Sequence, residues 1–448
     1  MSKKTYNISS ILSLISIMKN NGAKYFYAKI LSANDNSKNQ VYLGSDFTSL
    51  NIIPYSSVEE DSSLRAGSVR DRAKAQVSFF WLDADGCSPA PNTQLILYPK
   101  YPEVRISGFL LGAERSPSEL MKSREAGRVL FLGICSDGRV LGHVVSAVSS
   151  LAHEIKEAAP SLETIGVFFD LQPFLQTGRD SRETLLDTLH SIHMKGWINS
   201  QRLNGTGQVI PYNARNGGGY TLEAELGISP NGRSEPDFLG WEVKQYGVSD
   251  FVRYTPKSPV TLMTPEPTAG LYKEQGVETF LRRHGYPDTS GKENRINFGG
   301  VYATSRSFHH MTRLALRLKG YDPDKQKITD MNGGILLLDR DENIAASWSF
   351  SGLLEHWNRK HAKAVYVPSL MQGPPAEYRY GSMIQLCEET DFLLFLKALS
   401  EGAVYYDPAI KMEQNNAGKI IIKRRSQFRI RHQQLAGLYQ RFTVHSLI

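Results

Sequence analysis

The chain has few cysteines and no long apolar run. Only three cysteines occur in 448 residues, Cys87, Cys135 and Cys387, and their spacing does not suit a metal site. Scattered thiols of this kind argue against a disulfide framework or zinc and are typical of a reducing cytoplasm. No stretch of about twenty apolar residues is present, so we expect no transmembrane span. The apolar stretch 11–17 lacks a small-residue cleavage site and runs into Lys19, which indicates a helix rather than a signal peptide.

Nucleotide-binding fingerprints are also missing. The sequence contains no Walker motif and no dinucleotide-binding glycine pattern, and Asn332-Gly333-Gly334 is typical of a hairpin turn rather than a phosphate loop. We therefore expect no dependence on ATP or NAD. The formal net charge of +7 is compatible with a polyanionic partner, but many soluble proteins are equally basic.

The length and the pattern of apolar residues predict an α/β (α+β) multidomain protein. A chain of 448 residues should hold two or three domains. We expect a β-rich domain over 1–155, a mainly helical linker or start of the next domain over 156–195, and a mixed α/β domain over 196–448. Predicted strands are 25–31, 40–43, 76–81, 94–97, 105–110, 129–134, 140–145, 240–245, 297–303, 334–338 and 364–367; predicted helices are 151–158, 181–193, 277–284, 350–360 and 391–399.

The most informative segment is Pro-Asp-Phe-Leu-Gly-Trp-Glu-Val-Lys at 236–244. On a strand, Glu242 and Lys244 share one face, and Asp237 lies just before them. Two converging carboxylates suit Mg²⁺, and a neighbouring lysine can hold a water or offset charge on a phosphate. Such a set can hydrolyse a phosphodiester. The same spacing also occurs by chance at solvated strand edges that carry an ion pair, so the flanking sequence has to decide.

The flanking segments resemble the catalytic core of a known family. They are Gly-Trp-Ile-Asn-Ser-Gln-Arg at 196–202, Gly-Thr-Gly at 205–207 and Gly-Gly-Tyr-Thr-Leu-Glu-Ala-Glu-Leu-Gly-Ile at 218–228. In this order, and followed by 236–244, they are similar to the MvaI/BcnI restriction endonucleases, which are relatives of the repair nickase MutH among the PD-(D/E)XK nucleases. The resemblance implies a PD-(D/E)XK domain with a central mixed sheet. The insertion at 208–216 departs from the compact family pattern.

The resemblance assigns roles to the acidic and basic residues of this core. Asp237 and Glu242 would be the metal ligands for Mg²⁺, and Lys244 would be the catalytic lysine. Glu223 matches the helix glutamate of the MutH branch, which would support the metal or the attacking water; a surface carboxylate is the alternative. Glu225 competes for this role, but only Glu223 has the Glu-x-x-Leu-Gly spacing of the family.

The first domain resembles a different module. Residues 27–35, followed by Gln-Val at 40–41, look like the opening of the N-terminal effector domain of the restriction enzyme EcoRII, a DNA-binding β-pseudobarrel. The resemblance makes five residues candidates for DNA contact: Lys29, Ser32, Asn34, Asp35 and Arg105. Such side chains contact phosphates or base edges. A polar turn is the alternative for Ser-Ala-Asn-Asp, and a solvated loop is the alternative for the basic stretch 65–74.

The strongest basic cluster is 419–432, near the C-terminus. Its partial alternation predicts a strand that packs by Phe428 and Ile430 and presents the other side chains outward. Arginine can pair with guanine and glutamine with adenine, so these positions are candidates for DNA contact. A merely solvated basic edge strand is the alternative. The candidates are Arg424, Arg425, Gln427, Arg429 and Arg431, and MvaI/BcnI relatives end in a similar segment.

Four further residues are candidates for DNA contact: Arg202, Arg306, His309 and His310. The two histidines lack an acid or cysteine at zinc-ligand spacing, and a structural histidine pair is the alternative. We expect His193, close to Lys195 and Trp197, to pack rather than to react.

Together these patterns predict a Mg²⁺-dependent type II restriction endonuclease. The family resemblance implies cleavage of double-stranded DNA at a short CC/GG-containing pseudopalindrome, with 5′-phosphate products, by a cytoplasmic monomer that needs no membrane. A second copy of the site bound to the first domain would stimulate cleavage. A cognate DNA methyltransferase would be a genetic partner. The alternatives are a MutH-like repair nickase, which would require partner proteins and cut one strand, and a catalytically silent DNA-binding protein.

Overall fold

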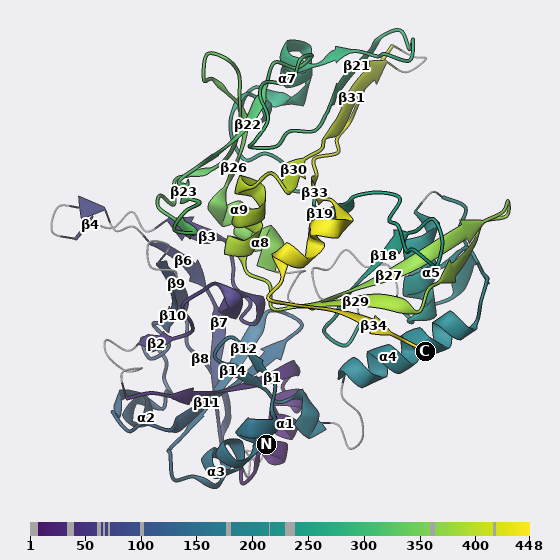
Figure 1. Ribbon diagram of the computed structural model, residues 1–448. Helices are drawn as coiled ribbons and strands as arrows, with labels where there is room; N and C mark the ends of the chain where they lie inside the picture. Colours follow the sequence, from purple (N-terminus) through teal and green to yellow (C-terminus); the bar gives the residue numbers. More distant parts are fainter. Residues whose placement is uncertain are drawn as a thin grey trace. The chain divides into compact units, whose positions relative to one another are not determined.

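The computed structural model of the chain contains two compact units (Figure 1). It describes residues 8–33, 40–60, 64–65, 68–69, 72–98, 103–175, 181–214, 216–228, 238–358, 363–414 and 418–448. The first unit comprises Met1–Ser191 with Phe238–Gly240, and the second comprises Ile192–Asp237 with Trp241–Ile448. The predicted domain ranges stay a prediction, because compactness alone does not show which parts fold independently. Within the described ranges, no helix is long and apolar enough to cross a membrane.

The first unit is built on a seven-stranded sheet. In spatial order the strands are β13 (Thr164–Ile165), β14 (Phe168–Asp170), β1 (Ala23–Leu31), β11 (Arg128–Cys135), β12 (Arg139–Val145), β7 (Ser78–Asp83) and β8 (Gly86–Pro89). Every residue of β11 is buried, as the central strand of a covered sheet should be. β11 and β12 form the predicted hairpin, in which Gly138 has a φ of +85° that favours glycine.

A five-stranded sheet and short helices complete this unit. Its strands are β2 (Gln40–Tyr42), β10 (Glu103–Ser107), β9 (Gln94–Tyr98), β6 (Ala73–Gln76) and β3 (Val58–Glu60), and β4 (Leu64–Arg65) pairs with β5 (Ser68–Val69). The helices are α1 (Ile11–Asn20), η1 (Thr48–Asn51), α2 (Ser118–Lys122), α3 (Ser150–Ala158), η2 (Ala159–Ser161), η3 (Gln172–Leu175) and α4 (Ser181–Met194), which extends into the second unit. α1 and α3 bury Leu14, Ile15 and Ile155 against Phe26 and Phe131. The predicted helix at 11–17 and the β-rich character are confirmed.

A six-stranded mixed sheet organises the part of the second unit that contains Glu242. β15 (Ile198–Asn199), β28 (Glu377–Tyr380), β27 (Lys363–Gln372), β29 (Met383–Glu388) and β34 (Arg441–Ser446) are antiparallel neighbours, and β18 (Glu242–Gly247) runs parallel to β27. α5 (Gly217–Glu225) packs against β18 and β16 (Gln201–Leu203) (Figure 1). β16 pairs with β17 (Val209–Pro211), so part of the unexpected insertion is a hairpin strand.

The rest of the second unit consists of smaller sheets and helices. The sheets are β19 (Val260–Met263), β33 (Phe428–Ile430) and β30 (Val404–Tyr406); β20 (Tyr286–Pro287), β21 (Arg295–Gly299), β31 (Ala409–Gln414) and β32 (Ile420–Lys423); β22 (Ala315–Lys319), β25 (Gly334–Leu338) and β26 (Ile344–Ser349); and β23 (Tyr321–Asp322) with β24 (Lys327–Ile328). The helices are α6 (Leu271–Glu274), α7 (Gly276–His284), α8 (Phe350–Asn358), α9 (Phe392–Ser400) and η4 (His432–Leu438). The ring of Trp348 packs edge-on against Tyr406 and Phe428, and this contact joins β26, β30 and β33.

Two predicted strands have different bounds because of backbone conformation. β18 begins at Glu242 rather than at Gly240, because Leu239 and Gly240 have φ values of +49° and +87°. β21 ends at Gly299 rather than at Ala303. Gly300 has a φ of +132°, and a Cβ there would come within 2.6 Å of the ring of His309.

Candidate functional site

Glu242 and Lys244 form an ion pair on β18, the strand after the turn at 239–240. Glu242 is buried, with 4% of its surface exposed, whereas the side chain of Lys244 is 30% exposed. The Nζ of Lys244 donates a hydrogen bond to Oε1 of Glu242. The two side chains therefore share one face of the strand, as their spacing predicts. A buried carboxylate beside a half-exposed cation is an arrangement that can bind a metal and meet a phosphate.

Phenolic side chains surround the buried carboxylate. Tyr366 on β27 is the register partner of Lys244. Burial raises the pKa of Tyr366 and of Tyr439, and the negative charge of Glu242 adds to both increases. Both phenols therefore stay protonated and neutral at physiological pH. Lys244, by contrast, carries a positive charge and forms an ion pair with Glu242.

Helix α5 lies against β18 because its first turn consists of glycines. A Cβ at Gly218 would come within 3.0 Å of Gln245, and the hydroxyl of Tyr380 donates to the carbonyl of Gly218 over 2.7 Å. Glu225 accepts hydrogen bonds from Lys195 and Gln201, at 2.5 and 2.7 Å. This pairing gives Glu225 a structural role, and the choice of Glu223 over Glu225 stays a prediction.

Glu223 lies on the same helix and is half-buried. Its charge, like that of Glu225, helps to raise the pKa of Tyr380, although burial is the main cause. Glu223 therefore lies near Tyr380, and its support of a metal or of the attacking water stays a prediction.

Three of the predicted site residues lie outside the described ranges: Asp237, Asn34 and Asp35. Within the described ranges, no three His, Cys, Asp or Glu side chains form a group that could hold a metal. The position of Asp237 decides whether Glu242 belongs to such a group. The assignment of Asp237 and Glu242 as metal ligands therefore stays a prediction.

His432 packs on the same face of β18, against Tyr246, which is two residues beyond Lys244. The ring centroids of His432 and Tyr246 are 3.9 Å apart, and Nε2 of His432 lies 2.8 Å from Oε1 of Gln385. Burial lowers the pKa of His432 to about 4. The imidazole is therefore neutral at physiological pH and joins η4 to the strand that carries Glu242 and Lys244.

Acidification should destabilise the protein through His432. Between its folded pKa of about 4 and its ordinary value of 6.5, the unfolded chain binds a proton that the folded chain does not. The stabilisation is thus complete above pH 6.5 and is lost as the pH falls towards 4, by about 3 kcal/mol at most. We expect His432→Phe, which keeps an aromatic ring beside Tyr246, to have a smaller drop in unfolding free energy between pH 7 and pH 4.5. Urea unfolding at both pH values measures this, and equal drops in the two proteins would contradict it.

The predicted contact residues of the first unit are mostly engaged within the protein. Lys29 is only 6% exposed, and its Nζ lies 3.4 Å from the carbonyl of Ile30, so it is not the surface cation that the resemblance implied. Arg105 pairs with Glu103 and donates to Gln40 over 3.2 Å. Ser32 is exposed. DNA contact by these residues stays a prediction.

The basic strand near the C-terminus is not the solvated edge strand of the alternative interpretation. β33 lies between β19 and β30, so it is a central strand. Gln427 is 3% exposed and accepts a hydrogen bond from Arg425, while Arg429 forms a 2.7 Å ion pair with Asp407. The prediction that Gln427 points outward was therefore wrong: its amide oxygen accepts from Arg425 and lies 3.5 Å from the hydroxyl of Thr261 on β19, a strand from a distant part of the chain. Arg424, Arg425 and Arg431 are exposed, as a DNA-facing role requires.

The remaining candidates form two local groups. The guanidinium of Arg202 lies 5.1 Å from the ring centroid of Tyr212. The His309 ring packs 5.3 Å from Tyr302, and burial lowers the pKa of His309. His310 and Arg306 are exposed. His309 is thus packed within the protein, and DNA contact by His309 stays a prediction. His193 also packs, with Nδ1 lying 2.7 Å from the carbonyl of Tyr380.

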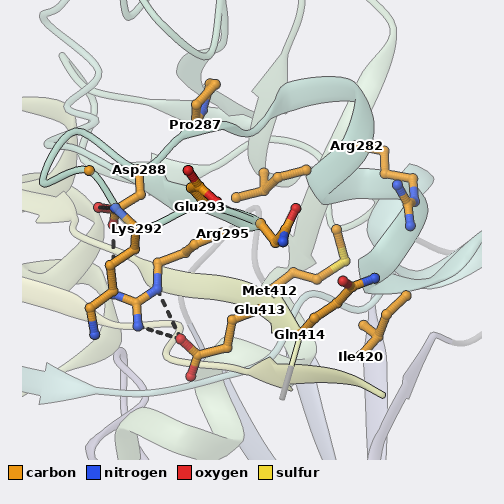
Figure 2. Close-up of a pocket in the computed structure, with 13 residues that line it drawn as sticks. Arg282, Pro287, Asp288, Lys292, Glu293, Arg295, Met412, Glu413, Gln414 and Ile420 are labelled. Atoms are coloured by element: carbon orange, nitrogen blue, oxygen red, sulfur yellow. Dashed lines mark hydrogen bonds and ion pairs between the residues drawn. The ribbon is translucent and has the colours of Figure 1, made fainter. Parts of the chain in front are cut away.

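A cavity of about 490 Å³ is lined by residues of the β20–β21 and β31–β32 hairpins and by Arg282 of α7. Figure 2 shows Arg295 directed towards Glu413, with which it forms an ion pair, and the guanidinium also lies 3.6 Å from Asp288. Hydrogen bonds from Ser290 and Asn297 keep the pKa of Asp288 well below its usual range. The arginine is thus neutralised by acids of the protein. None of the predicted catalytic residues lines this cavity, and sequence analysis had no signal for it.

Comparison with known proteins identifies the class of the chain. Residues 186–439, more than half of the chain, match a family of site-specific DNA endonucleases. The chain belongs to the MvaI/BcnI restriction endonuclease family. The match includes the Glu242–Lys244 strand, helix α5 and the basic segment around β33. The predicted family is therefore confirmed.

Among solved structures, the chain is similar to restriction endonuclease MvaI in complex with its cognate DNA, with 17% identity and a TM-score of 0.45 over 61% of this chain and 100% of that chain. It is also similar to MvaI in the absence of DNA, with 16% identity and a TM-score of 0.34 over 60% of this chain and 99% of that chain. No curated protein sequence matches the chain.

Proposed function

We propose that the protein is a Mg²⁺-dependent type II restriction endonuclease of the PD-(D/E)XK type, in the MutH-like branch, that hydrolyses duplex DNA at a short CC/GG-containing pseudopalindrome. The observation that carries the proposal is the Glu242–Lys244 pair on one face of β18, within the segment that matches the family. Burying a charge is costly, so the buried carboxylate of Glu242 beside a partly exposed lysine supports a functional role such as metal binding.

The donor set fits magnesium in its chemistry. The carboxylates of Asp237 and Glu242 are hard oxygen ligands of the kind that Mg²⁺ prefers. When bound, Mg²⁺ lowers the pKa of a coordinated water and offsets charge on the phosphate. Lys244, half-exposed next to Glu242, would position the attacking water and stabilise negative charge on the phosphate. Glu223 would support the same water from α5. We expect 5′-phosphate and 3′-hydroxyl ends.

The first unit would act as a DNA-binding effector domain. Its two larger β-sheets are compatible with the β-pseudobarrel that the resemblance to the EcoRII effector domain implies. In this proposal, a second copy of the site bound by the first unit stimulates cleavage by raising the local concentration of DNA. Plasmids with one or two copies of the site test this part, because equal cleavage rates would contradict it.

We expect the protein to cut supercoiled plasmid in the presence of Mg²⁺ and not in its absence. Asp237→Ala should abolish cutting while DNA binding in a gel-shift assay stays within a fewfold of the unchanged protein, because it removes a metal ligand but not a DNA contact. Asp341→Ala, at an exposed aspartate, is the matched control and should cut normally. An Asp237→Ala variant that still cuts would refute the assignment.

The same digest separates the alternatives. Nicked circles without linear product, and a need for partner proteins, would favour a repair nickase. Binding without any cut in Mg²⁺ would favour a silent DNA-binding protein. Sequencing the ends of the products gives the recognition site and the cut position.

A further inference from the structure

The loop 249–256, which follows the catalytic strand β18, exposes an apolar tip. Val252 is 89% exposed, the highest value among the large apolar side chains that the structure describes as exposed, and Arg253 beside it is also exposed. A single exposed valine is common on protein surfaces and needs no explanation by itself. Val252 is of interest because the rest of the loop is held in a fixed conformation.

The backbone of the loop is fixed by its own hydrogen bonds. Oδ1 of Asp250 accepts from the backbone N–H groups of Val252 and Arg253, at 2.9 and 2.7 Å. The N–H of Ser249 donates to the carbonyl of Thr255 over 3.0 Å and closes the loop. These backbone donors lower the pKa of Asp250, so its carboxylate stays charged. The tip is therefore preformed, and little ordering entropy has to be lost when it meets a ligand.

A socket formed by Gly381 and Ser382, between β28 and β29, holds the two aromatic side chains of the loop. Phe251 stacks on Tyr254 with 5.6 Å between ring centroids, and a Cβ at Gly381 would come within 2.8 Å of Phe251. The hydroxyl of Tyr254 lies 3.4 Å from Oγ of Ser382. Only a glycine at position 381 leaves room for these rings. Phe251 and Tyr254 thus support the loop from below, while Val252 points away from the socket into solvent.

Exposed cations lie on the loop or next to it. Arg253 is adjacent to Val252, the guanidinium of Arg379 lies 6.0 Å from the ring centroid of Phe251, and the side chain of Lys257 packs at Gly247. All three are exposed, so these cations outnumber the one carboxylate of the loop, Asp250. The charge around the tip therefore complements a polyanion rather than an apolar or acidic protein surface.

We propose that loop 249–256 is a preformed wedge, whose Val252 enters the minor groove of the DNA and partly unstacks a base step while Arg253, Lys257 and Arg379 contact the flanking phosphates. This proposal rests on the proposed function, because it takes duplex DNA as the substrate of this domain. A one-residue tip suits a groove about 6 Å wide. Apolar side chains flanked by cations kink DNA in this way and place more backbone within reach of the protein.

The test measures unwinding of closed circular DNA. The plasmid is one that the unchanged protein cuts. It is first bound to Lys244→Met protein, which should not cut it. Topoisomerase then relaxes the bound plasmid in the presence of Mg²⁺. After the protein is removed, we expect a shift in the topoisomer distribution. The double variant Lys244→Met/Val252→Ala should lose this shift. With Lys244 intact, Val252→Ala should lower kcat/KM for cleavage about tenfold. Val444→Ala, at a valine that is 54% exposed on β34, is the matched control and should change neither result.

Each outcome decides between separate claims. An equal topoisomer shift with and without Val252 would refute the wedge proposal but would not affect the proposed nuclease function. A protein that never cuts plasmid overturns the proposed function and the wedge with it. If Val252→Ala instead changes the sedimentation of the protein and not the topoisomers, the tip binds a second copy of the chain, and the wedge is again wrong. Gly381→Val, which should displace Phe251 and hence the loop, is expected to reproduce the loss of the shift.

Discussion

Glu242→Gln should lower the rate of DNA cleavage by about a thousandfold. The change keeps the shape of the side chain but removes the charge that would hold the metal and that pairs with Lys244. Because the neutral amide is cheaper to bury than the carboxylate, the fold should survive. Plasmid cleavage rates in Mg²⁺ measure the loss, and the thermal unfolding temperature reports on the fold.

Glu278→Gln is the matched control for this experiment. Glu278 lies on the exposed side of α7, where it pairs with Arg282 one helical turn later, and surface pairs of this kind contribute little. We expect its cleavage rate to equal that of the unchanged protein. A Glu242→Gln protein that cuts within tenfold of the normal rate would show that the carboxylate is structural. The proposed catalytic role of β18 would then be refuted.

Arg128→Ala should lower the unfolding free energy of the first unit by about 4 kcal/mol. Arg128 is fully buried at the start of β11, and its guanidinium donates to the carbonyls of Leu120 and Glu125, at 2.5 and 2.7 Å, with a longer contact of 3.4 Å to Ser32. Removing the side chain leaves several buried carbonyls without this donor and opens a cavity. Denaturant unfolding followed by circular dichroism measures the loss.

Arg124→Ala, four residues earlier at an exposed position, controls for the loss of a positive charge. We expect it to change the unfolding free energy by less than about 0.5 kcal/mol. A loss below 1 kcal/mol for Arg128→Ala would mean that water replaces the guanidinium at low cost. Arg128 also contacts Ser32, a predicted DNA-contact residue close to the candidates Asn34 and Asp35 in the sequence. DNA binding by the Arg128→Ala variant is therefore a second measurement.

The pattern of residues correctly predicted those features that depend on near neighbours. Glu242 and Lys244 share a face because side chains alternate along any strand. The helices at 11–20, 150–158 and 276–284 follow from apolar residues at helical spacing. The turn between β11 and β12 follows from Asp137-Gly138. The family followed from the order of several short motifs, and its match over residues 186–439 confirmed it.

Features that depend on distant neighbours were missed. Gln427 is buried directly before β33, whose neighbours β19 and β30 begin at Val260 and Val404, far away in the chain. The alternation of apolar residues in 419–432 does not reveal those partners. Lys29 looks like a surface residue in the sequence, yet the packing of the first unit covers it. Nothing in the sequence indicates the socket at Gly381, because the rings of Phe251 and Tyr254 that it holds are about 130 positions away in the chain.

The order of amino acids by itself determined the family, the face on which the acid and the amine of β18 lie, and most of the helices and strands, because alternation, helical spacing and motif order act over a few residues. Only the tertiary structure decided which polar side chains are buried, which cations are already neutralised by protein acids and which loop tip remains exposed. Burial and pairing are settled by residues far apart in the chain, and their meeting depends on how the sheets assemble.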